Sequence, residues 1–196
     1  MSTTPLARAT LALQGALDAH RAVTEGPLAA QVVDAAARLV RALRDGGTVY
    51  WVGNGGSAAD AQHLAAELVG RFHHDRPPLR SHALTVNTST LTALVNDYPP
   101  EQLFARQARA FCGPLDVLVG ISTSGNSANV VEALAAARAN GCGTIALTGA
   151  AGGRVTAHAD LVLRAPSTLT PRVQEVHILL GHTICELVEA ELHPKA

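Results

Sequence analysis

One sequence pattern occurs twice and constrains the fold more than any other: an apolar run typical of a strand, a short loop rich in glycine, serine and asparagine, and then a helical run. In the first copy Thr48–Val52 leads into the loop Gly53–Ser57, and in the second Asp116–Ile121 leads into Ser122–Ser127. Buried strands that alternate with helices across short connections form parallel sheets covered by helices on both faces. The sequence therefore predicts an α/β fold of this kind. Its strands are expected at residues 48–52, 82–86, 116–121, 144–147 and 160–163.

Helical periodicity accounts for most of the remaining chain. Apolar residues recur at three- and four-residue spacing over Leu6–Thr24 and Leu28–Asp45, and again over the long stretch from Pro171 to about Glu191. Further helices are expected at 58–72, near 91, near 103 and up to 140. No linker, low-complexity tract or solenoid repeat interrupts this order, so residues 1–196 are expected to form one domain.

The composition excludes several chemistries. Lys195 is the only lysine and stands next to the C-terminus, so a Schiff-base, pyridoxal-phosphate or P-loop lysine is not expected. A formal net charge of -1 argues against non-specific nucleic-acid binding. Neither a membrane span nor a signal pattern is visible. Cys112, Cys142 and Cys185 form no CxxC pair, so we expect buried, reduced thiols in a cytoplasmic protein.

The second loop favours phosphate binding. Ser122–Ser127 supplies four hydroxyls in six residues, together with Gly125, which lets a ligand approach the backbone closely. The unpaired N–H groups of the helix N-terminus that follows can bind an anion without any basic side chain, and hydroxyl groups add rotatable donors. Because serine and asparagine also favour ordinary helix caps, a simple polar loop is the alternative interpretation.

The first loop fits a competing pattern as well. Gly53, Gly55 and Ala58 match the dinucleotide-binding fingerprint G-x-G-x-x-G/A. That fingerprint also requires an acidic residue at the end of the next strand, to hold a ribose hydroxyl. Here the next strand ends in Val86-Asn87-Thr88, which contains no carboxylate, so the sequence disfavours a nicotinamide or flavin enzyme.

Side chains on two of the predicted helices suggest a metal site. His63 and Glu67 stand four residues apart on one helix face, and Asp60 lies about one turn earlier, a spacing suited to a divalent ion. Such pairs also occur on helices simply as polar surface. The last helix adds Gln174, Glu175, His177 and His182. A histidine within an apolar helical run is more often a hydrogen-bonded core residue than a ligand, so that reading stays open.

Helix geometry restricts how Gln174 and His182 could share one ion. On a straight helix they would lie about 12 Å apart along the axis and about 80° apart around it. Either Gln174 leans in from the first turn or one of the two ligands comes from a neighbouring subunit. His73 and His74 precede Pro77 in a polar segment that also contains Arg76, and the two histidines are interpreted as solvated loop residues.

Three motifs in this order resemble the sedoheptulose 7-phosphate isomerases, the phosphoheptose isomerases of the sugar-isomerase (SIS) domain superfamily. The motifs are GNGGSAADAQH from Gly53, ISTSGNSAN from Ile121 and TPRVQEVH from Thr170. The resemblance implies a three-layer, flavodoxin-like, five-stranded parallel sheet and a zinc site. It also implies a homotetramer whose active sites form between subunits, with the helices of residues 1–45 used in oligomer packing.

The resemblance also implies roles for individual residues. The metal ligands would be His63, Glu67, Gln174 and His182. The substrate-binding residues would be Asn54, Gly55, Gly56, Ser57, Asp60, Arg71, Asn96, Asp97, Ser122, Thr123, Ser124, Ser127 and Gln174.

The implied reaction converts sedoheptulose 7-phosphate to D-glycero-D-manno-heptose 7-phosphate, the first step toward ADP-heptose and lipopolysaccharide. Ketose–aldose exchange needs a base that moves a proton between C1 and C2 through a cis-enediol, and an acid that moves the oxygen protons. We expect Glu67 to be the base, His182 the acid, and one zinc ion per subunit to polarise the oxygens.

Two other functions stay open at this point. One is a regulatory SIS protein that binds a sugar phosphate and a partner protein without catalysis; a family relative of this kind lacks the histidine that matches His182. The other is an isomerase of a longer ketose phosphate from an antibiotic pathway.

Overall fold

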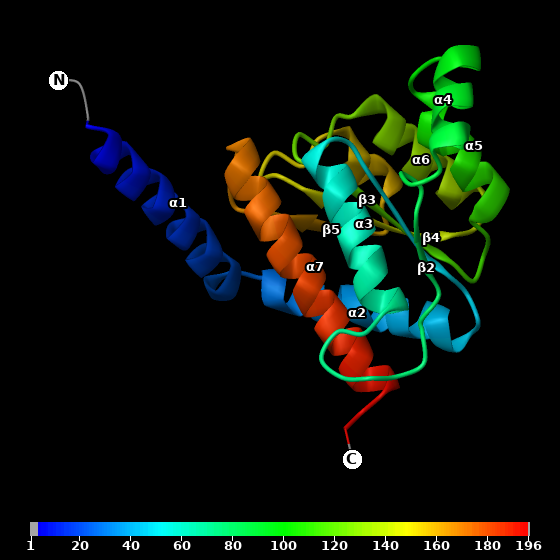
Figure 1. Cartoon of the computed structure of the whole chain (residues 1–196), viewed down its shortest axis with the longest axis horizontal. Helices are drawn as coiled ribbons and strands as arrows, with labels where there is room; N and C mark the ends of the chain where they lie inside the picture. Colours follow the sequence, from blue (N-terminus) through cyan, green and yellow to red (C-terminus); the bar gives the residue numbers. More distant parts are fainter. Residues whose placement is uncertain (1–3, 196) are drawn as a thin grey trace.

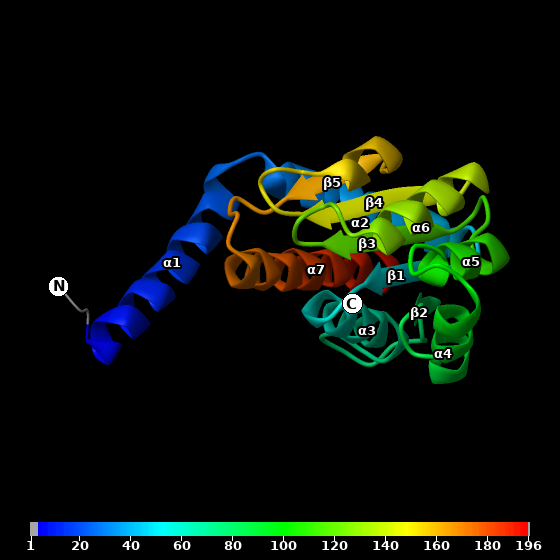
Figure 2. The same cartoon turned by 90° about the horizontal axis from the view of Figure 1, so that it is seen from above.

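In the computed structural model, which describes residues 4–195, a five-stranded parallel sheet lies between two layers of helices (Figures 1 and 2). The strands are β1 (Val49–Gly53), β2 (Ser81–Ala83), β3 (Val117–Ser122), β4 (Gly143–Thr148) and β5 (Leu161–Arg164). The helices are α1 (Pro5–Glu25), α2 (Leu28–Arg44), α3 (Gly56–Val69), α4 (Thr88–Asp97), α5 (Gln102–Phe111), α6 (Ala128–Ala139) and α7 (Thr170–Leu192), with the 3-10 helix η1 (Arg154–His158). This architecture confirms the predicted α/β fold.

The order of the strands places the two glycine- and serine-rich loops side by side. The strands lie in the order β2-β1-β3-β4-β5, and Gly53 at the end of β1 pairs with Ile121 in β3. From β1 the chain winds through α3 to the edge strand β2, then returns past β1 to β3 and continues to β5. The carboxyl ends of β1 and β3 therefore form the topological switch point, where open parallel sheets bind their ligands.

Alternate side chains of the inner strands enter two separate cores. Trp51 of β1 and Val119 of β3 pack with residues of α2, α3 and α7 on one face. Val52 and Leu118 pack with residues of α5 and α6 on the other face. Because both faces of these strands are buried, their sequences are nearly continuous apolar runs rather than alternating ones.

Two elements are shorter than the sequence predicts. α3 ends at Val69, directly before Gly70, rather than at Phe72. β2 ends at Ala83 rather than at Val86. The Leu84 N–H still donates to the Trp51 carbonyl at 2.9 Å, but the chain then turns away from the sheet edge. The segment between α3 and β2 is therefore longer than expected, and it passes beside the C-terminal part of α7 (Figure 1).

The first helix, α1, projects away from the sheet (Figures 1 and 2). Only Ala19 and Val23 of this helix are buried. Its leucines are each at least 60% exposed: Leu6, Leu11, Leu13 and Leu17. Arg172 at the start of α7 donates from Nη1 to the carbonyl of Ala12 at 2.6 Å, which ties the two helices together.

Among the helices of residues 4–195, none is long and apolar enough to cross a membrane.

His177 on α7 is a fully buried polar side chain. Neither ring nitrogen has a hydrogen-bond partner among residues 4–195. Burial lowers the pKa of His177 from 6.5 to about 4, against a smaller opposing effect of the Thr148 backbone. The folded chain therefore keeps this ring neutral in mildly acidic solution, where an unfolded chain would protonate it.

We expect His177 to weaken the fold as the pH falls from about 6.5 to about 4. In this window the unfolded chain binds a proton at the ring and the folded chain does not, so unfolding becomes easier by about 3 kcal/mol. His177→Phe keeps a planar ring and removes the titration. Between pH 7 and pH 4 the wild-type protein should lose about 3 kcal/mol more free energy of unfolding than the variant, measured by urea denaturation. Equal losses would show that His177 does not titrate as described.

Candidate metal centre and anion-binding loops

The loops after β1 and β3 are joined by a pair of asparagines. Nδ2 of Asn54 donates to Oδ1 of Asn129 at 2.8 Å, and Nδ2 of Asn129 donates to Oδ1 of Asn54 at 2.9 Å. Asn54 belongs to the first loop and Asn129 to the first turn of α6. The two reciprocal bonds fix the distance between the loops at the switch point. Asn129 occupies the same position in the second motif as Asp60 in the first, but nothing in the sequence predicts its amide partner.

The second loop turns its hydroxyl groups toward one another rather than toward the helix. Oγ of Ser122 lies 3.0 Å from Oγ of Ser127, while Ser127, the N-cap of α6, makes no side-chain cap bond. Oγ of Ser124 accepts from the Asn126 N–H at 3.1 Å. Gly125 has a φ of 66°, and a Cβ there would collide with the Gly152 carbonyl oxygen. The loop therefore needs glycine at this position to hold its shape.

Both helices at the switch point begin without a side-chain cap. α3 starts after Gly55, which has a φ of 53°, and α6 starts after Ser127. Each helix N-terminus carries a partial positive charge and N–H groups without an intrahelical acceptor. Ser57, in the first turn of α3, is buried. This arrangement suits an anion such as phosphate, as the sequence predicts, although no ligand tests the individual contacts.

Three of the four predicted metal ligands lie together on α3 and α7. Nε2 of His63 is 2.9 Å from Oε1 of Glu67, and Nε2 of His182 is 3.3 Å from Nε2 of His63. One ligand atom of each of the three residues lies within 4.8 Å of the other two. The pair on α3 follows from helical spacing, whereas His182 reaches it because α7 packs directly against α3.

These distances fit a tetrahedral metal ion. Two nitrogen ligands at 2.0–2.1 Å from such an ion stand about 3.3 Å apart. The two Nε2 atoms are at this separation. Without an ion, Nε2 of His63 could donate a proton to Glu67 or to His182 but not to both. A set of two imidazoles and a carboxylate is typical of zinc, so the residues present fit the metal that the sequence implies.

Gln174, the fourth predicted ligand, belongs to α7, and its side chain lies against the start of α3 in this chain. A Cβ built on Gly56 would stand 2.5 Å from Nε2 of Gln174, so the two residues are in direct contact. Gly56 precedes His63 by about two helical turns, roughly 10 Å along the axis. One chain therefore brings together three of the four predicted ligands, and the axial separation expected from the sequence between Gln174 and His182 is present.

Asp60 lies on α3 between Gly56 and His63, half buried. Its Oδ2 is buried and has no hydrogen-bond partner among residues 4–195, and the carboxylate makes no hydrogen bond with His63 there. Burial raises the pKa of Asp60, and the nearby His63 partly offsets this effect. An unpaired buried carboxylate oxygen is costly unless a ligand pairs with it, so Asp60 remains a candidate substrate contact.

The structure places the other predicted site residues at the end of α4, just after α3 and in the second loop. Asn96 and Asp97 end α4, and Nδ2 of Asn96 donates to Oδ1 of Asp97 at 2.7 Å. Arg71, just beyond α3, is exposed and makes no hydrogen bond or ion pair within residues 4–195. Thr123 is half buried in the second loop. Among residues 4–195, no hydrogen bond or ion pair joins Asn96, Asp97 or Arg71 to the metal ligands.

Gly181 is a site residue that the sequence does not identify. A Cβ at this position would lie 2.5 Å from Cδ1 of Leu64, which is fully buried on α3. The missing side chain lets α7 approach α3 closely, next to His182. A glycine inside an apolar helical run is the only available signal, and the sequence does not say which neighbour it accommodates.

Known proteins resemble this chain over most of its length. The pattern of the SIS domain family matches residues 16–149. A phosphoheptose isomerase of Rhodospirillum rubrum is 54% identical over 167 residues, 85% of this chain and 89% of that protein. One of Aquifex aeolicus is 56% identical over 161 residues, 82% of this chain and 84% of that protein. The structure of the Neisseria gonorrhoeae phosphoheptose isomerase matches with a TM-score of 0.89 at 42% identity, covering 95% of this chain and 100% of that one.

We expect Gly181→Ala to destabilise the protein. The new methyl group would force Leu64 to move in a filled core, which costs about 1–3 kcal/mol and exceeds the gain in helix propensity. Gly15→Ala on α1 is the matched control, since nothing lies within 4 Å of the position. The control should gain up to about 1 kcal/mol. Urea denaturation measures both, and a Gly181→Ala protein as stable as the control would refute the close approach.

Proposed function

We propose that this chain, which belongs to the phosphoheptose isomerases of the SIS domain family, converts sedoheptulose 7-phosphate to D-glycero-D-manno-heptose 7-phosphate with the help of zinc. The observation that carries the proposal is the cluster of His63, Glu67 and His182, which unites two nitrogen ligands and a carboxylate. A proton-transfer enzyme needs such groups, whereas a binding protein does not.

Three residues would hold the metal within one chain: His63, Glu67 and His182. Zinc bound there would polarise the oxygens on C1 and C2 of the substrate and favour ionisation of the hydroxyl group. We assign Gln174 as the fourth ligand, donated by a neighbouring subunit of a homotetramer. This assignment is supported by the contact of Gln174 with Gly56, which keeps it away from His63 in its own chain.

The chain's own residues would move the protons as follows. The Glu67 carboxylate takes the proton from C1 of the ketose and returns it to C2, through a cis-enediol. The His182 imidazole carries the proton between the oxygens on C1 and C2, which requires that the ring nitrogen that takes the proton is not bound to the metal at that step. Because a tightly bound carboxylate is a poor base, the bond of Glu67 to the metal has to be loose or to open when substrate binds.

The phosphate group would bind where the two loops meet. The hydroxyls of Ser122, Thr123, Ser124 and Ser127, with the open N-terminus of α6, supply donors without any lysine or arginine. Asn54, Gly55, Gly56, Ser57 and Asp60 line the start of α3 and would contact the sugar. We assign Arg71, Asn96 and Asp97 to the sites of neighbouring subunits.

The same proposal covers the setting of the enzyme. We place it in the cytoplasm, as one SIS domain through residues 1–196, with α1 and α2 used in packing between subunits. The exposed leucines of α1 support that use. The product would enter the pathway to ADP-heptose.

Glu67→Gln should lower kcat by at least about 100-fold, since a missing general base costs between 10² and 10⁴. The variant should remain folded, because Glu67 lies at the surface of α3. Glu186→Gln on α7 is a matched control, with its side chain 56% exposed and outside the metal cluster. Turnover is followed by NMR of the C1 and C2 signals. Near wild-type kcat in Glu67→Gln would refute its role as the base.

Removal of the metal separates the enzyme from a regulatory protein. The purified chain should contain about one zinc per subunit, lose turnover after dialysis against a chelator, and regain it when zinc is added back. A chain that holds no zinc and yields no aldose from sedoheptulose 7-phosphate would instead favour a sugar-phosphate-binding regulator. Faster turnover of an octulose 8-phosphate would favour the longer substrate.

A further inference from the structure

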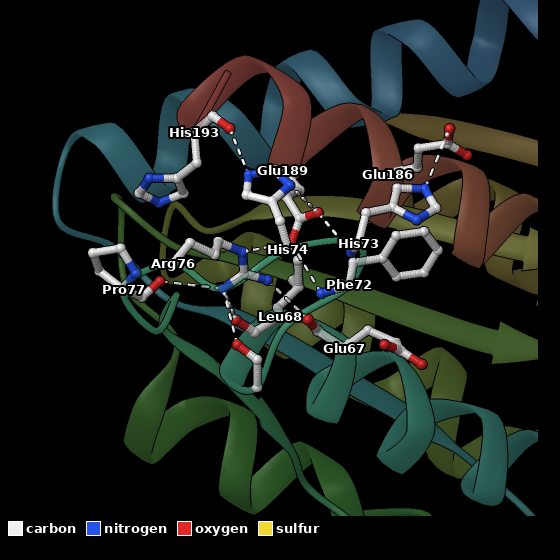
Figure 3. Close-up of polar contacts among 11 residues, drawn as sticks. Glu67, Leu68, Phe72, His73, His74, Arg76, Pro77, Glu186, Glu189 and His193 are labelled. Atoms are coloured by element: carbon white, nitrogen blue, oxygen red, sulfur yellow. Dashed lines mark hydrogen bonds and ion pairs between the residues drawn. The ribbon is translucent and has the colours of Figure 1, made fainter. Parts of the chain in front are cut away.

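A buried ion pair connects the two helices that carry the metal ligands. Nε of Arg76 lies 2.9 Å from Oε2 of Glu189 near the end of α7, and both side chains are only 1% exposed (Figure 3). The sequence interpretation of the two histidines in this segment as solvated is wrong for His74, whose side chain is 25% exposed. It holds for His73, which is 55% exposed.

The other donors of Arg76 bond mostly to the C-terminal end of α3, and Nη1 also donates to the Pro77 carbonyl at 3.2 Å. Nη2 donates to the Glu67 carbonyl at 2.9 Å, and Nη1 donates to the Leu68 carbonyl at 2.9 Å and to the Gly70 carbonyl at 3.3 Å. The last carbonyls of a helix lack intrahelical partners and carry a partial negative charge. The guanidinium therefore caps α3 at the turn that contains Glu67, one of the three metal ligands.

Glu189 collects the matching set of donors. Oε2 accepts from the Phe72 N–H at 2.9 Å and Oε1 from the His73 N–H at 2.7 Å. Nδ1 of His74 lies 3.3 Å from Oε1, and its Nε2 contacts the His193 carbonyl at 2.9 Å. Burial alone would raise the pKa of Glu189, but the bonds from His73, Phe72 and Arg76 lower it to about 2. The carboxylate is therefore charged throughout the physiological range.

The pair spans the two metal-bearing helices. Arg76 holds the backbone of Glu67, whose side chain faces His63 on α3. Glu189 lies about two helical turns beyond His182 on the same side of α7 as the loop. Relative sliding of α3 and α7 would therefore break bonds at the ion pair as well as separate His182 from His63.

Stability alone is a poor explanation for these charges. Replacing a buried ion pair with apolar residues of similar size is often neutral or stabilising, because the pair no longer has to be desolvated. The adjoining contact between α3 and α7 is already apolar, through Leu64, Leu68 and Cys185. What a hydrogen-bonded ion pair adds is direction: it accepts only one relative position of the two helices.

We propose that Arg76 and Glu189 are positioning residues for the metal centre, which set the position of His182 on α7 against His63 and Glu67 on α3. The inference rests on the proposed function in one respect, namely that the three side chains bind zinc. Mutating the residues that hydrogen-bond to metal-binding residues and orient them commonly lowers metal affinity by 10–100-fold.

The test measures zinc affinity and thermal stability of the metal-free protein. The variants are Glu189→Gln, which keeps the shape and removes the charge, and the double variant Arg76→Met with Glu189→Leu, which replaces the pair with apolar side chains. Glu191→Gln is the matched control: it breaks the exposed pair of Glu191 with Arg44, two residues further along α7. Zinc dissociation constants come from competition with a chromophoric chelator, well below each melting temperature.

We expect both variants of the Arg76–Glu189 pair to bind zinc at least tenfold more weakly, and Glu191→Gln to bind like the wild type. Lower melting temperatures with unchanged zinc affinity would overturn the inference, because the pair would then be only structural. Equal weakening in Glu191→Gln would also overturn it. If the double variant does not fold, Glu189→Gln decides alone. A wild-type chain that binds no zinc would overturn the proposed metal centre, and this inference with it. Zinc binding by the wild type with unchanged affinity in the variants would overturn this inference alone.

Discussion

The reversal of winding between β1 and β3 is the constraint on which the rest of the structure depends. Because β1 leads to one edge of the sheet and β3 to the other, no element separates the loops that follow them. α3 and α6 consequently begin side by side, with their positive ends open and joined by Asn54 and Asn129. The same winding places α3 next to α7, so the anion-binding loops and the metal ligands share one helix.

Local sequence patterns were sufficient to predict the features that depend on residues close together in the chain. The apolar strands, the serine-rich loop and the pair His63 and Glu67 all follow from periodicity or spacing. Features that depend on distant contacts were not predictable. The burial of Arg76 was not predicted because Glu189, its partner, lies 113 residues away, and only the packing of α7 on α3 brings them together. The close approach at Gly181 was likewise not predictable, because it depends on Leu64 of α3, which lies far away in the sequence.

The near-absence of lysine is consistent with the groups that the switch point offers to a phosphate. Lys195 is exposed beyond α7, so no ammonium group is available to a phosphate in the loops. The structure offers uncapped helix ends and hydroxyl groups instead, which need little desolvation and hold fixed directions. Strong charges are placed elsewhere, in the buried pair of Arg76 and Glu189. In the two proposals, anion binding and helix positioning therefore lie at opposite ends of α3.

The contrast in exposure between the buried ion pair and the cluster of His63, Glu67 and His182 supports the proposed assembly. The buried pair is 1% exposed, whereas the His63 side chain is 49% and the Glu67 side chain 24% exposed. Proton transfer at carbon needs a site from which water is excluded, because open solvent weakens every electrostatic interaction there. Since Gln174 contacts Gly56 rather than the cluster within its own chain, a neighbouring copy that contributes Gln174 would both complete the ligand set and cover the site.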